Sequence, residues 1–416
     1  MAAWLEAAFA ALLLPRVQSL SRTLLLLAGA GIFYLIAAAI TVRKETEAPA
    51  LRLRWIVLAA VAFRLTLLPL TPQLAHELWR FHWDGEIQAA GFNPYAYPPT
   101  HVVFQPIRQA ADRLAPGQAW AAFHPPLAER IFHWNFSLAS TLRLEKILYV
   151  GCDVLLILLL ARVLAARGRP REWTLLYAWS PLAVFEIAGN GHMEPVAGVL
   201  VLLALHWAGR RERRSGFVAG AAALTQWYAL VFLPIVFAAA RKRWLGAAGW
   251  MIALGAAVTV PYWFLNRTFA LGLVARTSWT HLASLPAFNA SIFALAQNWF
   301  GTPVAWAIAA GLVAALVTVH SWKRSEATRA AFGIVTAMIL VMPQVAPWHM
   351  LWLLPLVAIY PEAPWIYFSL AVLLGYGAVQ HPAWVWIEYA PLYAGLAWMA
   401  LRGRRQPRLA VAGAEA

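Results

Sequence analysis

The chain has 416 residues, of which 62% are hydrophobic and 12% are charged, and its formal net charge is +15. Soluble domains carry about a quarter charged residues, so this composition excludes an ordinary soluble protein and favours one that is dissolved in lipid. The basic residues gather in short clusters between apolar runs, as they do in cytoplasmic loops. The sequence has no basic stripe on a polar domain, which is the feature that would indicate nucleic-acid binding.

The N-terminal part predicts one interfacial or re-entrant helix and two membrane spans. Residues 1–17 have no basic region before their apolar stretch, so we expect no cleaved signal peptide, and the stretch is too short to span. Residues 24–42 form the first predicted span and end in a basic cluster taken as cytoplasmic. Residues 55–72 then cross outward, and the mid-span Arg64 requires a polar partner inside the bundle. The single cysteine, Cys152, excludes an internal disulfide.

The stretch from residue 73 to residue 146 is polar and rich in proline and histidine, so we expect a large external loop there. Further spans are predicted at residues 147–166, 173–188, 195–207, 245–264, 304–320, 332–344, 351–360, 365–380 and 384–401. Residues 217–240 are basic at both ends, which favours a hairpin of two short helices that turns at residues 225–227. Chain 1–416 is therefore expected to be one all-α, polytopic integral membrane domain of about twelve transmembrane helices.

The polar residues that are not cytoplasmic anchors fall on the external side. Asp84 follows an apolar span and lies among aromatic residues, with Arg80 one helical turn before it. Partial desolvation raises the pKa of a carboxyl group and a nearby cation lowers it, a balance that suits a general base. Glu86 is interpreted as a neighbouring surface acid. Asn93 and Tyr95, on either side of a proline, are expected to form a turn that shapes the loop.

Four segments in order carry a family resemblance. RFHWDGEIQAAGFNPY (80–95), SPLAVFEIAGNGHMEP (180–195), AGAAALTQWYALVFLP (219–234) and PWHMLWLLPL (347–356) resemble segments of GT-C superfamily glycosyltransferases that use polyprenyl-phosphate sugars. They resemble especially the bacterial mannosyltransferase-like members of this superfamily. The resemblance extends from about residue 64 to about residue 355.

The resemblance implies an inverting transfer of a sugar, by default mannose, from a polyprenyl-phosphate donor to a glycolipid or another lipid-linked glycan. Asp84 would deprotonate or orient the acceptor hydroxyl. Cationic or donor groups must face the departing phosphate, and the candidates are Arg276, His281, His192 and His349. No cofactor is implied. The protein would lie in the cell membrane with its site on the non-cytoplasmic side.

The sequence departs from the family pattern at three positions, which concern the donor and its placement. Many relatives have lysine at Gln226, aspartate near Glu194 and tyrosine near His349. The resemblance therefore leaves the identity of the donor open at these positions, and it leaves Asp84 unaffected.

The polar link 189–194 and its neighbourhood supply the remaining candidate residues. Glu186 lies in an apolar run, so we expect either a pair with Asn190 at i+4 or a role in the substrate site. A divalent ion held by Glu186, His192 and Glu194 is an alternative, although no metal site is assigned. Trp348 and its neighbour His349 suit either an interface anchor or the site.

Two other classes of function compete with the transferase. A transporter or flippase of lipid-linked sugars requires polar groups spread across the depth of the bilayer, whereas these gather on one side. A non-catalytic membrane scaffold would leave Glu186 and the short paired helices unexplained.

Overall fold

The computed structural model describes residues 1–14, 19–43, 52–109, 114–138, 141–240, 244–266 and 287–405. Within these ranges the regular elements are helices, and the only β-type pairing is an isolated bridge between Phe288 and Gln344. The predicted all-α class is therefore confirmed. The expected external loop 73–146 contains two helices of its own, and its last residues already belong to a long apolar helix.

In chain order, the α-helices of the described residues are α1 (Ala2–Leu12), α2 (Leu20–Arg43), α3 (Leu53–Leu67), α4 (Glu77–Ala89), α5 (Pro126–Leu138), α6 (Leu142–Ala166), α7 (Leu175–Ala178), α8 (Pro181–Val184), α9 (Glu194–Trp207), α10 (Glu212–Thr225), α11 (Leu233–Ala239), α12 (Trp244–Asn266), α15 (Ile292–Phe300), α16 (Thr302–Trp322), α17 (Ala327–Val341), α18 (Leu354–Ile359), α19 (Ala363–Ala371) and α20 (Trp384–Arg405). A π-helical turn, Phe185–Gly189, follows α8.

Three helices of the described chain, α2, α6 and α16, are long and apolar enough to cross a membrane. Several other predicted spans are helical but shorter, such as α3 with 15 residues and α9 with 14, whereas α12 and α20 have 23 and 22 residues. At about 1.5 Å per residue, a 15-residue helix covers about 22 Å, less than the ~30 Å of a hydrocarbon core. The structure therefore supports a membrane bundle, while about twelve full crossings stay a prediction.

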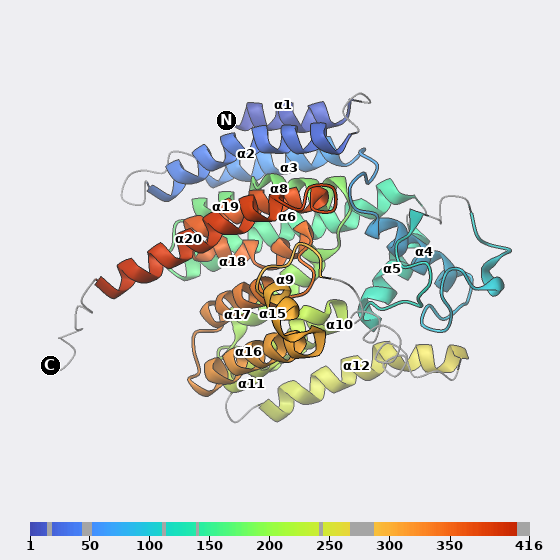
Figure 1. Cartoon of the computed structure of the whole chain (residues 1–416). Coiled ribbons are helices and arrows are strands. Elements are labelled where there is room, and N and C mark those ends of the chain that lie inside the picture. The colour runs from blue at the N-terminus through green and yellow to red at the C-terminus, as the bar shows by residue number, and fades with distance from the viewer. Residues whose placement is uncertain are drawn as a thin grey trace.

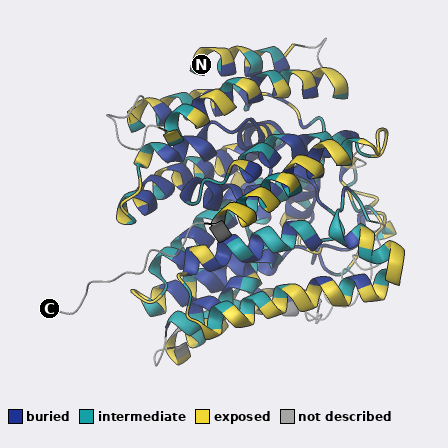
Figure 2. Cartoon of the chain, turned by 60° about the vertical axis from the view of Figure 1, so that its left-hand side comes forward, coloured by how far each residue is buried: buried dark blue, intermediate teal, exposed yellow. Residues whose placement is uncertain are grey.

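The longer helices run broadly alongside one another, and α4, α5 and the segment between them gather at one end of the bundle (Figure 1). Buried residues lie where helices face one another, and exposed residues lie on the outer sides (Figure 2). Many exposed residues are large and apolar, including Leu25 and Ile32 on α2 and Trp386 on α20. Apolar outer faces are expected of helices that contact lipid.

The break at residues 225–227 is confirmed. α10 ends at Thr225, Gln226 has extended backbone, and the chain resumes as a 3₁₀ turn followed by α11, which packs back against α10. The prediction for Arg64 is confirmed as well. Its guanidinium pairs with Asp153 of α6 and donates to Ala178 O at 2.8 Å, and all three residues are buried. A buried charge is tolerated in such a bundle only with partners of this kind.

Candidate functional site

The first polar cluster lies where α4 packs against α5. Gly85 allows this approach, because a Cβ atom there would lie 2.6 Å from the carbonyl oxygen of Phe132. One turn earlier, Phe81 stacks on Phe132 with ring centroids 4.5 Å apart. The two helices are thus held in contact by a small residue and an aromatic pair. Neither α4 nor α5 is among the apolar helices that suit a membrane span.

Asp84 lies at this contact and is fully buried. Arg80 Nε donates to its two carboxylate oxygens at 2.9 and 2.8 Å, and Arg80 Nη1 donates to the carbonyls of Gly117 and Trp120 at 2.9 and 3.1 Å. The expected contact between Asp84 and Arg80 is therefore confirmed. Burial raises the pKa of Asp84, and the charge and hydrogen bond of Arg80 oppose this, with burial prevailing.

Two further titratable side chains lie next to Asp84, namely His124 and Glu129. One carboxylate or imidazole atom of each of the three residues lies within 4.8 Å of the others. Burial first and the charge of Asp84 second raise the pKa of Glu129 well above its usual value. Burial, followed by the charge of Arg80, lowers the pKa of His124 to about 3, so its imidazole is neutral. We call Arg80, Asp84, His124 and Glu129 the Asp84 cluster.

The predicted turn at residues 93–95 is confirmed. Asn93 Oδ1 accepts from the backbone N–H of Tyr95 at 3.0 Å, and Asn93 Nδ2 donates to Tyr262 O of α12 at 3.1 Å. Tyr95 Oη donates to His124 O at 2.7 Å. Tyr262 Oη in turn donates to Gln88 Oε1 at 2.9 Å. The turn therefore ties the loop to α12 and to the backbone beside the Asp84 cluster.

The second polar cluster lies at the interrupted helix before α9. The π-helical turn carries Glu186, and Asn190 Nδ2 donates to Glu186 Oε2 at 3.0 Å, as the i+4 spacing predicted. His192 Nε2 lies 3.3 Å from Glu186 Oε2, and its Nδ1 lies 3.5 Å from Glu194 Oε2. These four residues are buried. π-Helical turns inside helices occur often at functional sites.

Lys146, from the first turn of α6, holds this interruption in place. Its Nζ donates to Leu70 O, Ala188 O and Gly189 O at 2.6, 2.7 and 3.0 Å. An interrupted helix leaves carbonyl groups without intrahelical partners, and the ammonium group supplies donors to them. Gly191 follows with φ of +82°, and a Cβ there would lie 2.7 Å from Leu78 Cδ2. The link therefore turns sharply against α4.

Glu77, the first residue of α4, faces the same place. Its Oε2 lies 4.0 Å from His192 Nε2 and has no hydrogen-bond partner, and the side chain is 27% exposed. A carboxylate at a helix N-terminus is also favoured by the helix dipole. We call Glu77, Glu186, Asn190, His192 and Glu194 the His192 cluster. Among its carboxylates Glu77 is the most exposed.

Two aromatic residues from distant segments complete the His192 cluster. The Trp348 ring stacks on the His192 imidazole, with centroids 4.7 Å apart. Tyr376 Oη donates to Glu186 at 2.8 Å and accepts from Asn190 Nδ2 at 3.2 Å. Trp348 was expected at the site or at an interface, and the structure places it against His192.

Three of the other predicted residues, Glu86, Gln226 and His349, lie in the part of the chain that the structure describes. Glu86 is half-buried and its Oε1 lies 3.5 Å from Gln109 Nε2. Gln226 is at the break after α10. His349 Nδ1 accepts from the backbone N–H of Ala346 at 3.1 Å, so that nitrogen caps the turn. Arg276 and His281 lie outside the described residues.

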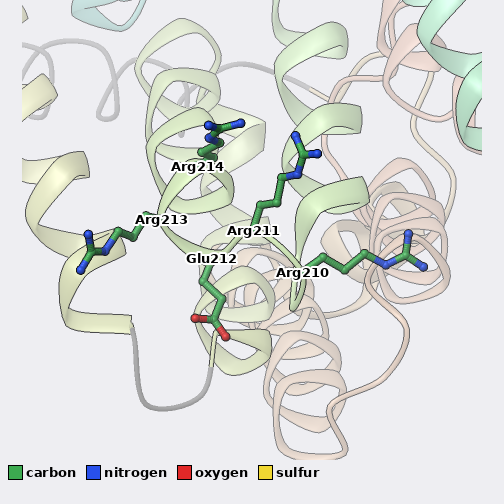
Figure 3. A pocket seen from close by; sticks show the side chains of 5 residues that line it. All are labelled: Arg210, Arg211, Glu212, Arg213 and Arg214. Atoms are coloured by element: carbon green, nitrogen blue, oxygen red, sulfur yellow. The ribbon is translucent and has the colours of Figure 1, made fainter.

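An open pocket lies beyond the other end of α9. It is lined by Arg210, Arg211, Glu212, Arg213 and Arg214. The 14 residues of α9 put about 20 Å between this end and Glu194. The charged side chains point in different directions and do not converge on a common point (Figure 3). This arrangement fits a basic loop at a membrane surface better than a built anion site.

Sequence reasoning missed several residues of both clusters. Glu77 has the clearest signal among them, since it is the first acid after the apolar span 55–72, but the family motif is centred on Asp84. His124 and Glu129 sit within the predicted loop and gave no motif. Lys146 appeared only as the end of that loop, and Tyr376 lies 190 residues from the carboxylate that it contacts.

The fold and these clusters define a class of protein: an apolar helical bundle with a carboxylate-rich polar site at one end. The model of glycosyltransferase family 87 matches residues 123–347, which is more than half of the chain. The chain belongs to glycosyltransferase family 87. The match includes the interrupted helix, His124 and Glu129, but starts after α4. Comparisons with curated proteins and with solved structures found no match.

Proposed function

We propose that the chain transfers a sugar, with mannose as the first candidate, from a polyprenyl-phosphate donor to a lipid-linked or glycan acceptor. The site would face the non-cytoplasmic side of the cell membrane. The observation that carries the proposal is the unpartnered Glu77 carboxylate oxygen 4.0 Å from His192, where α4 meets the interrupted helix. A polar site beside apolar helices suits a substrate with a lipid tail and a polar head.

In the proposed reaction the acceptor hydroxyl attacks the anomeric carbon of the donor sugar. A carboxylate takes the hydroxyl proton, the bond from the anomeric carbon to the phosphate oxygen breaks, and polyprenyl phosphate leaves with inversion at the anomeric carbon. His192 would supply a hydrogen bond to the departing phosphate, whose negative charge grows in the transition state. Trp348, stacked on His192, would offer an apolar face to the sugar.

We propose Glu77 as the general base. A base must come within hydrogen-bond reach of the proton that it removes, directly or through one water. The Glu77 side chain is 27% exposed and its buried Oε2 has no hydrogen-bond partner, whereas the two oxygens of Asp84 accept from Arg80 and that side chain is fully buried. Asp84, which the family resemblance implies for this role, stays a prediction that the same experiment tests.

The experiment uses purified protein in liposomes with radiolabelled polyprenyl-phosphate mannose and a membrane glycolipid extract. The variants are Glu77→Gln and Asp84→Asn, with Glu86→Gln as a matched acid-to-amide control on the same helix. Loss of a general base slows transfer by roughly 10²- to 10⁴-fold. We expect this loss for Glu77→Gln, with an unchanged melting temperature, and transfer close to wild type for Glu86→Gln.

Other results would change the assignment. Full transfer by Glu77→Gln rules that residue out, and a specific loss in stably folded Asp84→Asn would assign the base to Asp84. If the wild type transfers no mannose, other polyprenyl-phosphate sugars are tested next. Failure with all of them, together with movement of the lipid-linked sugar between leaflets, would favour a flippase.

A further inference from the structure

The Asp84 cluster contains two polar atoms that face each other without a hydrogen bond between them. His124 Nδ1 lies 3.8 Å from Glu129 Oε1, and neither atom has a hydrogen-bond partner. The Glu129 side chain is fully buried and the His124 residue is 8% exposed. Buried polar atoms are almost always satisfied, so two that face each other require an explanation.

We propose that Asp84, His124 and Glu129 bind a divalent first-row metal ion, Zn²⁺ or Mn²⁺, between α4 and α5. One ligand atom from each residue lies within 4.8 Å of the others. This site lies outside the His192 cluster, and it does not depend on the proposed donor or on Glu77.

The distance between these two atoms favours an ion over a shared proton. A donor–acceptor separation of about 3.6 Å is already too long for a hydrogen bond. Zinc bonds to imidazole nitrogen and carboxylate oxygen are about 2.0–2.2 Å long, so two ligands of one ion are about 3.4 Å apart at a tetrahedral angle and up to about 4.2 Å apart at wider angles. The observed 3.8 Å falls within the range that an ion bridges.

The types of ligand narrow the choice of metal. A neutral imidazole together with two carboxylates suits Zn²⁺ or Mn²⁺, whereas Mg²⁺ and Ca²⁺ prefer oxygen ligands alone. Arg80 offsets the charge of Asp84 by the hydrogen bonds to its two oxygens, and the Glu129 charge then leaves the cluster with one net negative charge. One proton on Glu129 would also neutralise that charge. The charge balance therefore does not distinguish a bound ion from a proton, whereas the 3.8 Å distance between His124 Nδ1 and Glu129 Oε1 favours the ion.

The ligands come from three places in the chain. Asp84 is on α4, His124 precedes α5, and Glu129 is in the first turn of α5. The ion would therefore join α4 to α5, next to the contact that Gly85 makes with Phe132. A structural ion of this kind stabilises a protein because it binds the folded chain and not the unfolded one.

The test measures metal in the full chain, purified in detergent without an affinity tag, after incubation with ZnCl₂ or MnCl₂ and dialysis. The variants are His124→Gln and Glu129→Gln, and the control is His133→Gln, a half-buried histidine of α5. We expect about one metal ion per wild-type and control chain, a loss of at least tenfold in both site variants, and a higher melting temperature for metal-loaded wild type.

Three results would overturn the proposal. The first is less than about a tenth of an ion per wild-type chain at micromolar metal. The second is metal retained by both site variants but lost in His192→Gln, which would move the ion to the His192 cluster. If the site variants do not fold, the wild-type protein is loaded with Co²⁺ and its visible absorption spectrum is measured. Absorption bands of nitrogen-ligated Co²⁺ support the site. Their absence is the third result that contradicts the proposal.

Discussion

The substitution Asp84→Asn removes one charge of the buried pair with Arg80 and keeps the size of the side chain. The Arg80 side chain is 2% exposed and that of Asp84 is 0% exposed, so the remaining guanidinium charge would stay out of water. Removing one partner of a buried pair costs about 3–5 kcal/mol. We expect the free energy of unfolding to fall by about 3 kcal/mol, the lower end of this range, because Arg80 keeps its hydrogen bonds to the carbonyls of Gly117 and Trp120.

The assay is thermal unfolding in detergent followed by tryptophan fluorescence, with transfer activity measured per folded protein. A double-mutant cycle of Asp84→Asn, Arg80→Met and Arg80→Met/Asp84→Asn isolates the pair. The double variant should lose less stability than the two single changes summed, because it leaves no unpaired charge. Glu86→Gln should shift stability by no more than about 0.5 kcal/mol. The reasoning is refuted if Asp84→Asn melts like the wild type yet transfers no sugar, since Asp84 would then act in the chemistry.

Three further predictions concern other parts of the molecule. Lys146→Met should lower kcat at least tenfold, because two carbonyls at the interrupted helix and that of Leu70 lose their charged donor, whereas Arg143→Met on the exposed side of the same helical turn should leave kcat unchanged. Tyr376→Phe should lower kcat about tenfold with little change in melting temperature, since it removes one hydroxyl from the His192 cluster. Burial raises the pKa of Glu326, but hydrogen bonds, the largest of them from Tyr360, lower it to about 2. The Glu326 carboxylate therefore stabilises the folded protein above pH 4.5, and this contribution is lost as the pH falls toward 2. Because that side chain is 52% exposed, Glu326→Gln should cost only about 1 kcal/mol at pH 7 and nothing near pH 2, as measured by melting temperature across that range.

The sequence predicted those features of the fold that depend on local pattern. Apolar runs predicted the helices, basic residues at both ends predicted the break at 225–227, and the mid-span Arg64 predicted a polar partner. It did not predict which helices are long enough to span. Helix length depends on where polar and proline-rich turns interrupt an apolar run, and hydropathy alone averages over such turns.

At the site, too, contacts between residues close in sequence were predicted, and contacts between distant segments were missed. The contact between Glu186 and Asn190 follows from their i+4 spacing, as does the contact between Arg80 and Asp84. Tyr376 reaches Glu186 only because distant helices pack together, and no spacing encodes that contact. Glu77 was visible as an acid after a span, but only the structure brings it to His192.

The two clusters are connected through α4, and this connection bears on how any variant is interpreted. Glu77 and Asp84 lie seven positions apart on that helix, which is about 10 Å along its axis. The ion pair and the contact at Gly85 fix the middle of α4 against α5, and Glu77 projects from its first turn toward His192. A change at Asp84 can therefore lower activity by moving Glu77 as well as by removing a base. If the melting temperature and the position of α4 are unchanged in a variant, a loss of transfer indicates that the replaced residue is the base. Activity therefore has to be compared between variants of equal stability.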